Sequence, residues 1–177
     1  MDPHPRLLLI EMLLMDVDGV LTDGSITYGD QGTELKTFFV RDGSGLKIWT
    51  GLGKRAGIIT GRRSPLVDRR AAELGIATVV QGADDKNAAL DAVLARERLR
   101  PEQVAYVGDD LPDVPVLARC GLAVAVADAC REAQAQAHYV TRAAGGRGAV
   151  RETIEWILRG QGLWRQALAK CGIASGA

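Results

Sequence analysis

The stretch that most constrains this chain is a short apolar run that ends in paired carboxylates. Residues 12–15 are all apolar, and Asp16 and Asp18 follow one residue apart, before Gly19. Such a run predicts a central parallel strand buried on both faces, with the aspartates in the crevice where open α/β sheets hold their ligands. Two carboxylates at a buried edge repel each other, so the pair predicts a bound cation or a shared proton. An Asx-rich turn after a strand is the alternative.

Length and composition exclude several classes of protein. With 177 residues, of which 47% are hydrophobic and 25% charged, the chain is expected to form one α/β domain over residues 1–177. A formal net charge of zero argues against a nucleic-acid binder driven by bulk electrostatics. Only His4 and His138 are present, so Ser-His-Asp, Cys-His and His-ligated zinc chemistries lack parts. Any catalysis is expected to use carboxylates.

The sequence favours a cytoplasmic protein that binds no membrane. Cys120, Cys130 and Cys171 show no metal-ligand spacing and are expected to be reduced thiols. The N-terminal segment is not expected to be a signal peptide, because Glu11 and Asp16 interrupt its apolar residues. No apolar run approaches the roughly 18–20 residues that a membrane-spanning helix needs.

A hairpin and a helix are predicted to follow the first acidic pair. Residues 24–40 predict a β-hairpin with strands at 25–28 and 35–40. The hairpin directly follows the carboxylate edge, so it is expected to project beside the site. An amphipathic helix that contains Leu46 and Leu52 comes next.

A candidate phosphate-binding turn follows the second strand, predicted at residues 58–59. That strand ends in Thr60, Gly61 and Arg62, and a helix begins with Ser64 as its N-cap and proline at its first position. A hydroxyl and exposed amides at a strand-to-helix turn suit a phosphate oxygen. Ordinary capping is the alternative, since a Thr-Gly-Arg sequence alone is a weak signal.

Lys86 stands at the start of a predicted helix over residues 87–97, after a strand at 77–80. The helix macrodipole favours anions at that end. A cation placed there hints at an anionic partner, although a lone lysine is usually only solvated.

A second predicted strand, at residues 104–107, also ends in acids: Asp109, Asp110 and Asp113. The carboxyl ends of parallel strands meet at one edge of the sheet. Two strands that both end in paired aspartates therefore predict a Mg²⁺ site built from oxygen ligands. Two unrelated acidic loops are the weaker alternative.

The C-terminal third continues the alternation of predicted strands and helices. A buried strand is predicted at 122–126, a helix around 131–137 and a short strand at 139–140. A glycine-rich loop at 144–152 opens the final helix. The tail at 160–177 is apolar enough that we expect it to dock on its own domain or on a neighbour.

The acidic pairs and the residues between them resemble the motifs of the haloacid dehalogenase (HAD) superfamily of phosphatases. The four motifs occur in the expected order as Asp16-Val17-Asp18, Thr60, Lys86 and Gly108-Asp109-Asp110. The resemblance covers about residues 8–158. Within the superfamily the chain is similar to the 3-deoxy-D-manno-octulosonate 8-phosphate (KDO 8-phosphate) phosphatases of lipopolysaccharide synthesis. The matching stretches are 39–43, 59–62, 106–110 and 144–152.

This resemblance implies a fold, a reaction and an assembly. The fold would be a Rossmann-like three-layer α/β/α sandwich around a central parallel sheet, without a cap domain, because too few residues separate the motifs to hold one. The reaction would be Mg²⁺-dependent hydrolysis of KDO 8-phosphate to KDO and phosphate through an aspartyl-phosphate. A capless site is open to water, and the resembling family closes it in a homotetramer.

The resemblance also implies a role for each motif residue. Asp16 would be the nucleophile and a metal ligand, Asp18 the acid/base and a ligand through its backbone carbonyl, and Asp109 the third ligand. Asp110 and Asp113 would support them. Thr60, Gly61 and Lys86 would hold the phosphoryl group, and Lys86 would also assist catalysis by neutralising charge. The residues expected to bind the sugar acid are Arg41, Arg62 and Arg70.

Two other functions fit part of the pattern. A phosphatase for nine-carbon sugar acid 9-phosphates, of the KDN or sialic type, is similar to this sequence, but such enzymes tend to have an acidic residue at the place of Arg62 and a small polar one at the place of Arg41. A phospho-acceptor receiver module also has acidic strand ends and a lysine. In such a module the phosphate-accepting aspartate follows a strand in the middle of the sequence, and no second aspartate is needed two residues later. The aspartate pair directly after the first strand of this chain therefore favours catalysis.

Overall fold

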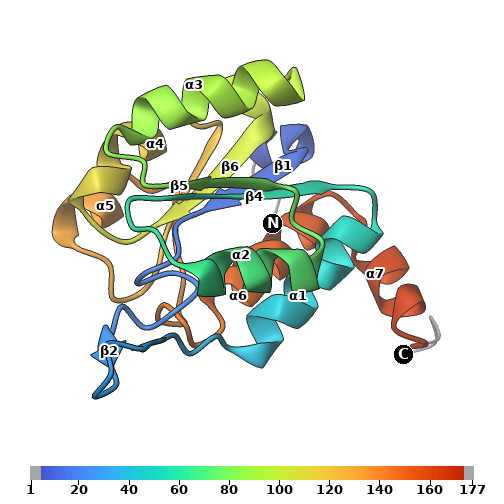
Figure 1. Ribbon diagram of the computed structural model, residues 1–177. Coiled ribbons are helices and arrows are strands. Elements are labelled where there is room, and N and C mark those ends of the chain that lie inside the picture. The colour runs from blue at the N-terminus through green and yellow to red at the C-terminus, as the bar shows by residue number, and fades with distance from the viewer. Residues whose placement is uncertain (1–4, 174–177) are drawn as a thin grey trace.

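Figure 1 shows the computed structural model, which describes residues 5–173, as a sheet between two layers of helices. The six strands of the sheet are ordered β5-β4-β1-β6-β7-β8 and pair in parallel throughout. They are β1 (Met12–Met15), β4 (Arg55–Thr60), β5 (Thr78–Gln81), β6 (Val104–Gly108), β7 (Leu122–Ala125) and β8 (Tyr139–Val140). The expected three-layer α/β/α fold is confirmed.

Helices α3 and α4 lie on one side of the sheet with α5 beside α4, and α1, α2, α6 and α7 lie on the other (Figure 1). The helices are α1 (Val40–Gly51), α2 (Pro65–Leu74), α3 (Lys86–Glu97), α4 (Val114–Leu117), α5 (Arg131–Gln136), α6 (Ala149–Gly160) and α7 (Trp164–Lys170). Short 3₁₀ helices cover Pro5–Leu9, Pro101–Gln103 and Leu111–Asp113. None of the helices in the described part of the chain is long and apolar enough to cross a membrane.

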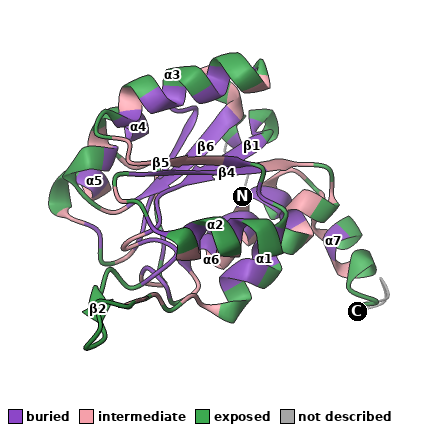
Figure 2. Cartoon of the chain, viewed as in Figure 1, coloured by how far each residue is buried: buried purple, intermediate pink, exposed green. Residues whose placement is uncertain are grey.

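Strand β1 is central, as its apolar sequence predicts. It lies between β4 and β6, and all four of its side chains have no exposure to solvent. Figure 2 shows β1, β4 and β6 buried, the edge strand β5 mostly intermediate, and the helices buried only on their inner sides. A strand covered on both faces needs no polar alternation, which explains why the run is uniformly apolar. The position of β1 brings Asp16 to the middle of the carboxyl edge.

The hairpin between β1 and α1 is shorter than predicted. Only β2 (Thr27–Tyr28) and β3 (Glu34–Leu35) pair, antiparallel, and they form a sheet separate from the main one. The predicted strand over 35–40 is therefore wrong beyond Leu35. Helix α1 already begins at Val40, and the side chain of Asp42 in its first turn accepts hydrogen bonds from the backbone N–H groups of Gly148 and Arg151 at 3.2 and 2.7 Å, which ties α1 to the start of α6.

Two glycines near the start of α1 are unusual residues for a helix. Gly43 and Gly45 suggest a loop, yet both lie buried inside the helix. A Cβ atom at Gly45 would come within 2.9 Å of Arg151 Cδ and 3.3 Å of its Cα, so glycine here lets α1 pack closely on α6. Helix interiors normally disfavour glycine, and close packing is the compensating reason.

The predicted N-cap of α2 is confirmed, and α3 begins one residue earlier than predicted. Ser64 caps α2 by accepting from the N–H of Leu66, with Pro65 at the first position, and α3 begins at Lys86 with Asp85 as its cap. The tail docks on its own chain: α7 contacts α1 and α6, and the guanidinium of Arg159 lies 4.6 Å from the Trp164 ring centre. Residues 174–177 of the predicted tail and His4 lie outside the described residues.

Candidate active site

A pocket of about 300 Å³ lies at the carboxyl edge of the sheet, where β1, β4 and β6 end. It is lined by the residues that the sequence motifs predicted: Asp16, Asp18, Thr60, Gly61, Arg62, Lys86, Asp109 and Asp110, with Ala83, Asp84 and Pro112. Motifs separated by more than ninety residues in the sequence thus meet because parallel strands present their carboxyl ends at one edge.

Lys86 and Asp16 form the floor of this pocket. The ammonium of Lys86 donates to Oδ2 of Asp16 at 2.8 Å, and the other oxygen of Asp16 accepts from the N–H of Val17 at 2.6 Å. Burial alone would lower the pKa of Lys86, but the charges of Asp16 and Asp113 outweigh it and raise that pKa. Lys86 is therefore held as a cation beside Asp16, which explains why it can stand at a helix start against the macrodipole.

Asp113 lies behind the pocket and has no solvent exposure. Its Oδ1 accepts from Lys86 at 2.6 Å and from the hydroxyl of Tyr106 at 2.6 Å, and its Oδ2 accepts from the N–H groups of Asp109 and Asp110 at 3.0 and 3.3 Å. The predicted supporting residue thus links both acid-tipped strand ends to the lysine. Asp110, the other supporting residue, is exposed at the rim.

The acidic groups could hold a cation. Asp16, Asp109 and Asp113 each offer an oxygen within 4.8 Å of the others. Burial, followed by repulsion from Asp113 and Asp16, raises the pKa of Asp109 to about 8. Burial also raises the pKa of Asp16 against the attraction of Lys86. The Oδ1 of Asp109 is buried without a hydrogen-bond partner, so an incoming cation would satisfy an atom that the protein leaves unpaired.

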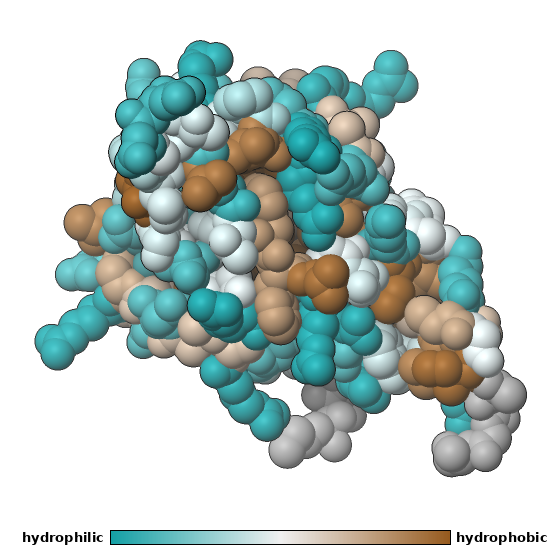
Figure 3. All heavy atoms as spheres, turned by 60° about the horizontal axis from the view of Figure 1, so that its bottom comes forward, coloured by the Kyte–Doolittle hydropathy of each residue, from teal (hydrophilic) through white to brown (hydrophobic). Residues whose placement is uncertain are grey.

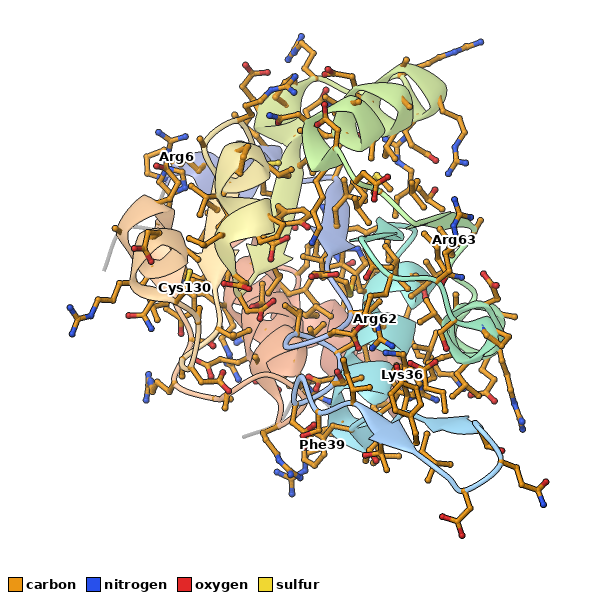
Figure 4. The ribbon with its side chains drawn as sticks, turned by 60° about the vertical axis from the view of Figure 1, so that its left-hand side comes forward. Arg6, Lys36, Phe39, Arg62, Arg63 and Cys130 are labelled. Atoms are coloured by element: carbon orange, nitrogen blue, oxygen red, sulfur yellow. The ribbon has the colours of Figure 1, made fainter. Side chains whose placement is uncertain are left out.

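The carboxylate of Asp18 points to a different set of partners. Lys36 donates to its Oδ1, and Nη1 of Arg62 lies 3.7 Å from its Oδ2. Glu34 joins these two cations, since its Oε1 lies 3.7 Å from Lys36 and accepts from Nη2 of Arg62 at 2.8 Å. Figure 4 labels Lys36, which comes from the hairpin, and Arg62, which comes from the loop after β4.

Lys36 and Glu34 were not identified in the sequence. The only signal was their spacing: residues two apart on an extended segment point to one face, whereas Leu35 between them is exposed. That spacing does not indicate which residues the shared face contacts.

Arg41 and Arg70 are not brought into this pocket. Arg70 packs on the Phe38 ring, with its guanidinium carbon 5.7 Å from the ring centre, and pairs with Glu73 at 3.1 Å. Arg41 is exposed in the first turn of α1 and lines another groove of about 490 Å³. Both were expected to bind the sugar acid, but neither lines the pocket. Only Arg62 of the three predicted arginines reaches the pocket.

The larger groove holds different chemistry. Arginines dominate its lining, and its carboxylates are occupied: Glu152 accepts from Tyr139 and two backbone N–H groups, and Glu155 pairs with Arg151 at 2.7 Å. It contains no aspartate pair. The smaller pocket at the strand ends is therefore the candidate active site.

The glycine loop before α6 supports the pocket from outside. A Cβ at Gly145 would lie 1.7 Å from the carbonyl oxygen of Gly19, so only glycine fits where this loop packs on the Asp-x-Asp turn. The loop is tied further by the N–H of Gly145, which donates to Asp128 at 2.9 Å. The long matching stretch at 144–152 therefore shapes the turn that carries Asp18.

The fold and this acid-and-lysine site are those of a haloacid dehalogenase-like hydrolase, and residues 59–153 match the model of that family, to which the chain belongs. The chain is 53% identical over 152 residues to the KDO 8-phosphate phosphatase KdsC of Yersinia pestis, covering 86% of this chain and 81% of that protein. Identity to KdsC of Escherichia coli K12 is 50% over 153 residues, with the same coverage.

A solved structure shows the same similarity. The KDO 8-phosphate phosphatase of Moraxella catarrhalis, crystallised in complex with a magnesium ion, a phosphate ion and KDO, superposes with a TM-score of 0.92 at 42% identity. The match covers 94% of this chain and 96% of that one. The resemblance inferred from the motifs is thereby confirmed across nearly the whole chain.

Proposed function

We propose that this chain hydrolyses KDO 8-phosphate to KDO and inorganic phosphate, as a Mg²⁺-dependent phosphoric monoester hydrolase. The observation that carries the proposal is the Asp16 carboxylate, fixed 2.8 Å from the Lys86 ammonium beside the unpaired Oδ1 of Asp109. This arrangement occurs in a chain that is 53% and 50% identical to the KDO 8-phosphate phosphatases of Yersinia pestis and Escherichia coli K12 over the matched residues.

The residues present fit a magnesium ion. Asp16 and Asp109 would hold it with their carboxylates and Asp18 with its backbone carbonyl, an oxygen-only set of the kind that Mg²⁺ prefers. The unpaired, buried Oδ1 of Asp109 supports this assignment. When bound, the ion supplies Lewis-acid stabilisation of charge on the phosphoryl oxygens.

Asp16 is assigned the nucleophile. Its carboxylate oxygen forms a bond to phosphorus while the bond from phosphorus to the sugar oxygen breaks, which leaves an aspartyl-phosphate. Asp18 donates a proton to the departing sugar oxygen. It then takes a proton from the water that attacks the aspartyl-phosphate, so that phosphate leaves and both aspartates are restored. Asp18 lines the pocket two residues from Asp16, as this double role requires.

Thr60, Gly61 and Lys86 are assigned to the phosphoryl group. Thr60 ends β4 and is almost fully buried, and Gly61 follows at the pocket wall. Phosphoryl transfer depends mainly on positioning and on neutralising charge. Lys86, held as a cation between two carboxylates, can neutralise the repulsion between an anionic nucleophile and an anionic phosphate.

Arg62 is assigned to bind the carboxylate of the sugar acid. Its Nη1 is buried at the pocket without a hydrogen-bond partner, and a guanidinium is suited to a carboxylate. Arginine at this place favours KDO 8-phosphate over the nine-carbon sugar acid 9-phosphates. Arg41 and Arg70 lie outside the pocket of their own chain, so they would not contact a substrate held there.

A homotetramer is proposed as the working form, in the cytoplasm. Large apolar side chains are exposed on and after the hairpin, at Ile26, Tyr28, Leu35 and Val40, and one face of the molecule shows separate hydrophobic areas among hydrophilic ones (Figure 3). Covering them with other subunits would also limit the access of water to the pocket. The thiols of Cys120, Cys130 and Cys171 are all unpaired, which suits a reducing compartment.

Steady-state assays on three phosphate esters test the function. With Mg²⁺, KDO 8-phosphate should give a higher kcat/KM than KDN 9-phosphate or p-nitrophenyl phosphate, and EDTA should abolish turnover reversibly. Preference for KDN 9-phosphate would favour the nine-carbon alternative. A phosphorylated protein that persists without turnover would favour the receiver-like module, and activity that survives exhaustive chelation would remove the metal from the mechanism.

A further inference from the structure

Four charged side chains of the hairpin and the pocket form a closed ring of alternating sign. Lys36 donates to Asp18 and lies 3.7 Å from Glu34, Glu34 accepts from Arg62 at 2.8 Å, and Arg62 returns to Asp18 at 3.7 Å. The side chain of Lys36 is only 2% exposed, so the ring is closed on the hairpin side.

Within the ring, Glu34 holds Arg62 in one direction. Its Oε1 accepts from Nη2 of Arg62, and its Oε2 accepts from the hydroxyl of Ser64 at 2.6 Å. Ser64 is itself fixed as the N-cap of α2, and its N–H donates to Gln81 at 2.7 Å. Both carboxylate oxygens of Glu34 are therefore anchored, and Oε1 fixes the position of the Nη2 end of the Arg62 guanidinium.

The other end of that guanidinium has an ion pair but no hydrogen bond, since Nη1 lies 3.7 Å from Oδ2 of Asp18. Nη1 of Arg62 is buried and has no hydrogen-bond partner, and Arg62 lines the candidate active site. A buried donor without a partner is unfavourable by itself. It makes sense where a ligand supplies the missing acceptor.

We propose that Glu34 is a specificity-determining positioning residue, which aims Nη1 of Arg62 at the carboxylate of an acidic sugar phosphate. This inference rests on the proposed function for the identity of that substrate. Glu34 touches no reacting atom and acts through Arg62. A hairpin residue thus sets how well the pocket distinguishes a sugar acid phosphate from an ester without a carboxylate.

The chain offers a matched control for Glu34. Glu97 accepts from the hydroxyl of Thr78 at 2.7 Å and lies 3.6 Å from Arg55, and its side chain is 18% exposed, as is that of Glu34. It stands at the end of α3, where Arg55 opens β4, away from the strand ends that form the pocket. Glu97→Ala removes the same kind of contacts without touching Arg62.

The test is a double-mutant cycle on KDO 8-phosphate and p-nitrophenyl phosphate. Glu34→Ala should lower kcat/KM on KDO 8-phosphate by about 10- to 100-fold, mainly through KM, because one charged hydrogen bond no longer orients Arg62. The loss on p-nitrophenyl phosphate should be at least about tenfold smaller. In an Arg62→Ala background, Glu34→Ala should add less than about twofold. Glu34→Gln, which keeps an acceptor, should recover part of the loss.

Several outcomes would overturn the proposal. These are losses that multiply in the double variant, equal losses on both substrates, or a loss from Glu97→Ala as large as that from Glu34→Ala. A crystal structure of the Glu34→Ala chain gives a readout independent of the substrate: Arg62 should turn away from the pocket, and an unmoved Arg62 would refute the proposal even if Glu34→Ala lowered activity. If the wild-type chain turned over p-nitrophenyl phosphate but not KDO 8-phosphate, the proposed function would fail, while that structure would still decide the role of Glu34.

Discussion

Asp113 and Lys86 form an ion pair behind the active site, with Nζ of Lys86 2.6 Å from Oδ1 of an aspartate that no solvent reaches. The lysine lies at the first position of α3, and the aspartate ends the 3₁₀ helix Leu111–Asp113 that follows β6. Their contact ties the third motif to the fourth. It also aims the ammonium at Asp16, since a lysine without such an anchor has four rotatable bonds to explore.

Removing Asp113 should both destabilise the protein and disable the site. Asp113→Ala leaves Lys86 with one carboxylate and Tyr106 without an acceptor, and losing one partner of a buried ion pair typically costs about 3–5 kcal/mol. Urea unfolding should show a loss of this size, and turnover should fall with it. A loss below about 1 kcal/mol would mean that Asp113 does not anchor the lysine.

The Tyr106 hydroxyl should contribute a smaller part of the same network. Tyr106→Phe removes a 2.6 Å hydrogen bond to Asp113 and keeps the ring, which has no exposure. We expect a loss of about 1.5–3 kcal/mol in the free energy of unfolding, as is typical of bonds to charged groups. Tyr139→Phe is the matched control: it removes a 2.6 Å bond to Glu152 at a half-buried site and should have the smaller effect. The reverse order would contradict this account.

Substitutions of the two aspartates of the first motif should affect catalysis differently. Asp16→Asn should abolish phosphoryl transfer, because an amide is no nucleophile. Asp18→Asn should lower kcat by a factor of about 10²–10⁴, the typical contribution of acid/base catalysis, while its backbone carbonyl still binds the metal. Rapid-quench assays of labelled phosphate on the protein can separate the two. Near-normal turnover by Asp16→Asn would exclude Asp16 as the nucleophile.

Magnesium should stabilise the protein more at higher pH. The pKa of Asp109 is raised to about 8, above its unfolded value, so between these values the metal-free folded state binds a proton that the unfolded state lacks. Stability of the metal-free protein should therefore decrease as the pH rises through this window. Mg²⁺ needs the deprotonated carboxylate, so the rise in Tm that it causes should be larger at pH 8 than at pH 6.

Asp109→Asn is the control for this titration. The amide cannot lose a proton, so the variant should show a smaller decrease in Tm between pH 6 and pH 8 without metal, and little gain from Mg²⁺. A Mg²⁺-dependent shift in Tm that stays constant between the two pH values in the wild-type chain would show that Asp109 does not exchange a proton for the metal.

Substrate preference should depend on Arg62 but not on its neighbour. Arg62→Glu should lower kcat/KM on KDO 8-phosphate far more than on p-nitrophenyl phosphate, which has no carboxylate to hold. Arg63→Glu makes the same change of charge at an exposed residue outside the pocket and should leave kcat/KM unchanged on both substrates. Equal losses on both substrates from Arg62→Glu would show that this arginine supports the fold or the phosphate group instead.

The amino-acid sequence by itself determined the sheet, the metal-binding edge and the family. The run before Asp16 must be buried on both faces because it has no polar alternation, and acids at the ends of two such strands must meet. Ser64 and Pro65 define the start of α2 by local hydrogen bonding alone. These signals are readable because each depends on residues within one element, or on the rule that parallel strands end together.

The tertiary structure alone decided which side chains turn toward the pocket. Asp113 anchors Lys86, and Lys36 and Glu34 join Asp18 to Arg62, across sequence separations that no local pattern spans. Arg41 and Arg70 were expected to bind the sugar acid, yet Arg70 packs on Phe38 and Arg41 lines the other groove, so neither reaches the pocket. Gly43 and Gly45 lie within α1 where two other helices pack closely, α2 against Gly43 and α6 against Gly45. Side-chain direction and close packing arise between elements, so they exist only once the chain has folded.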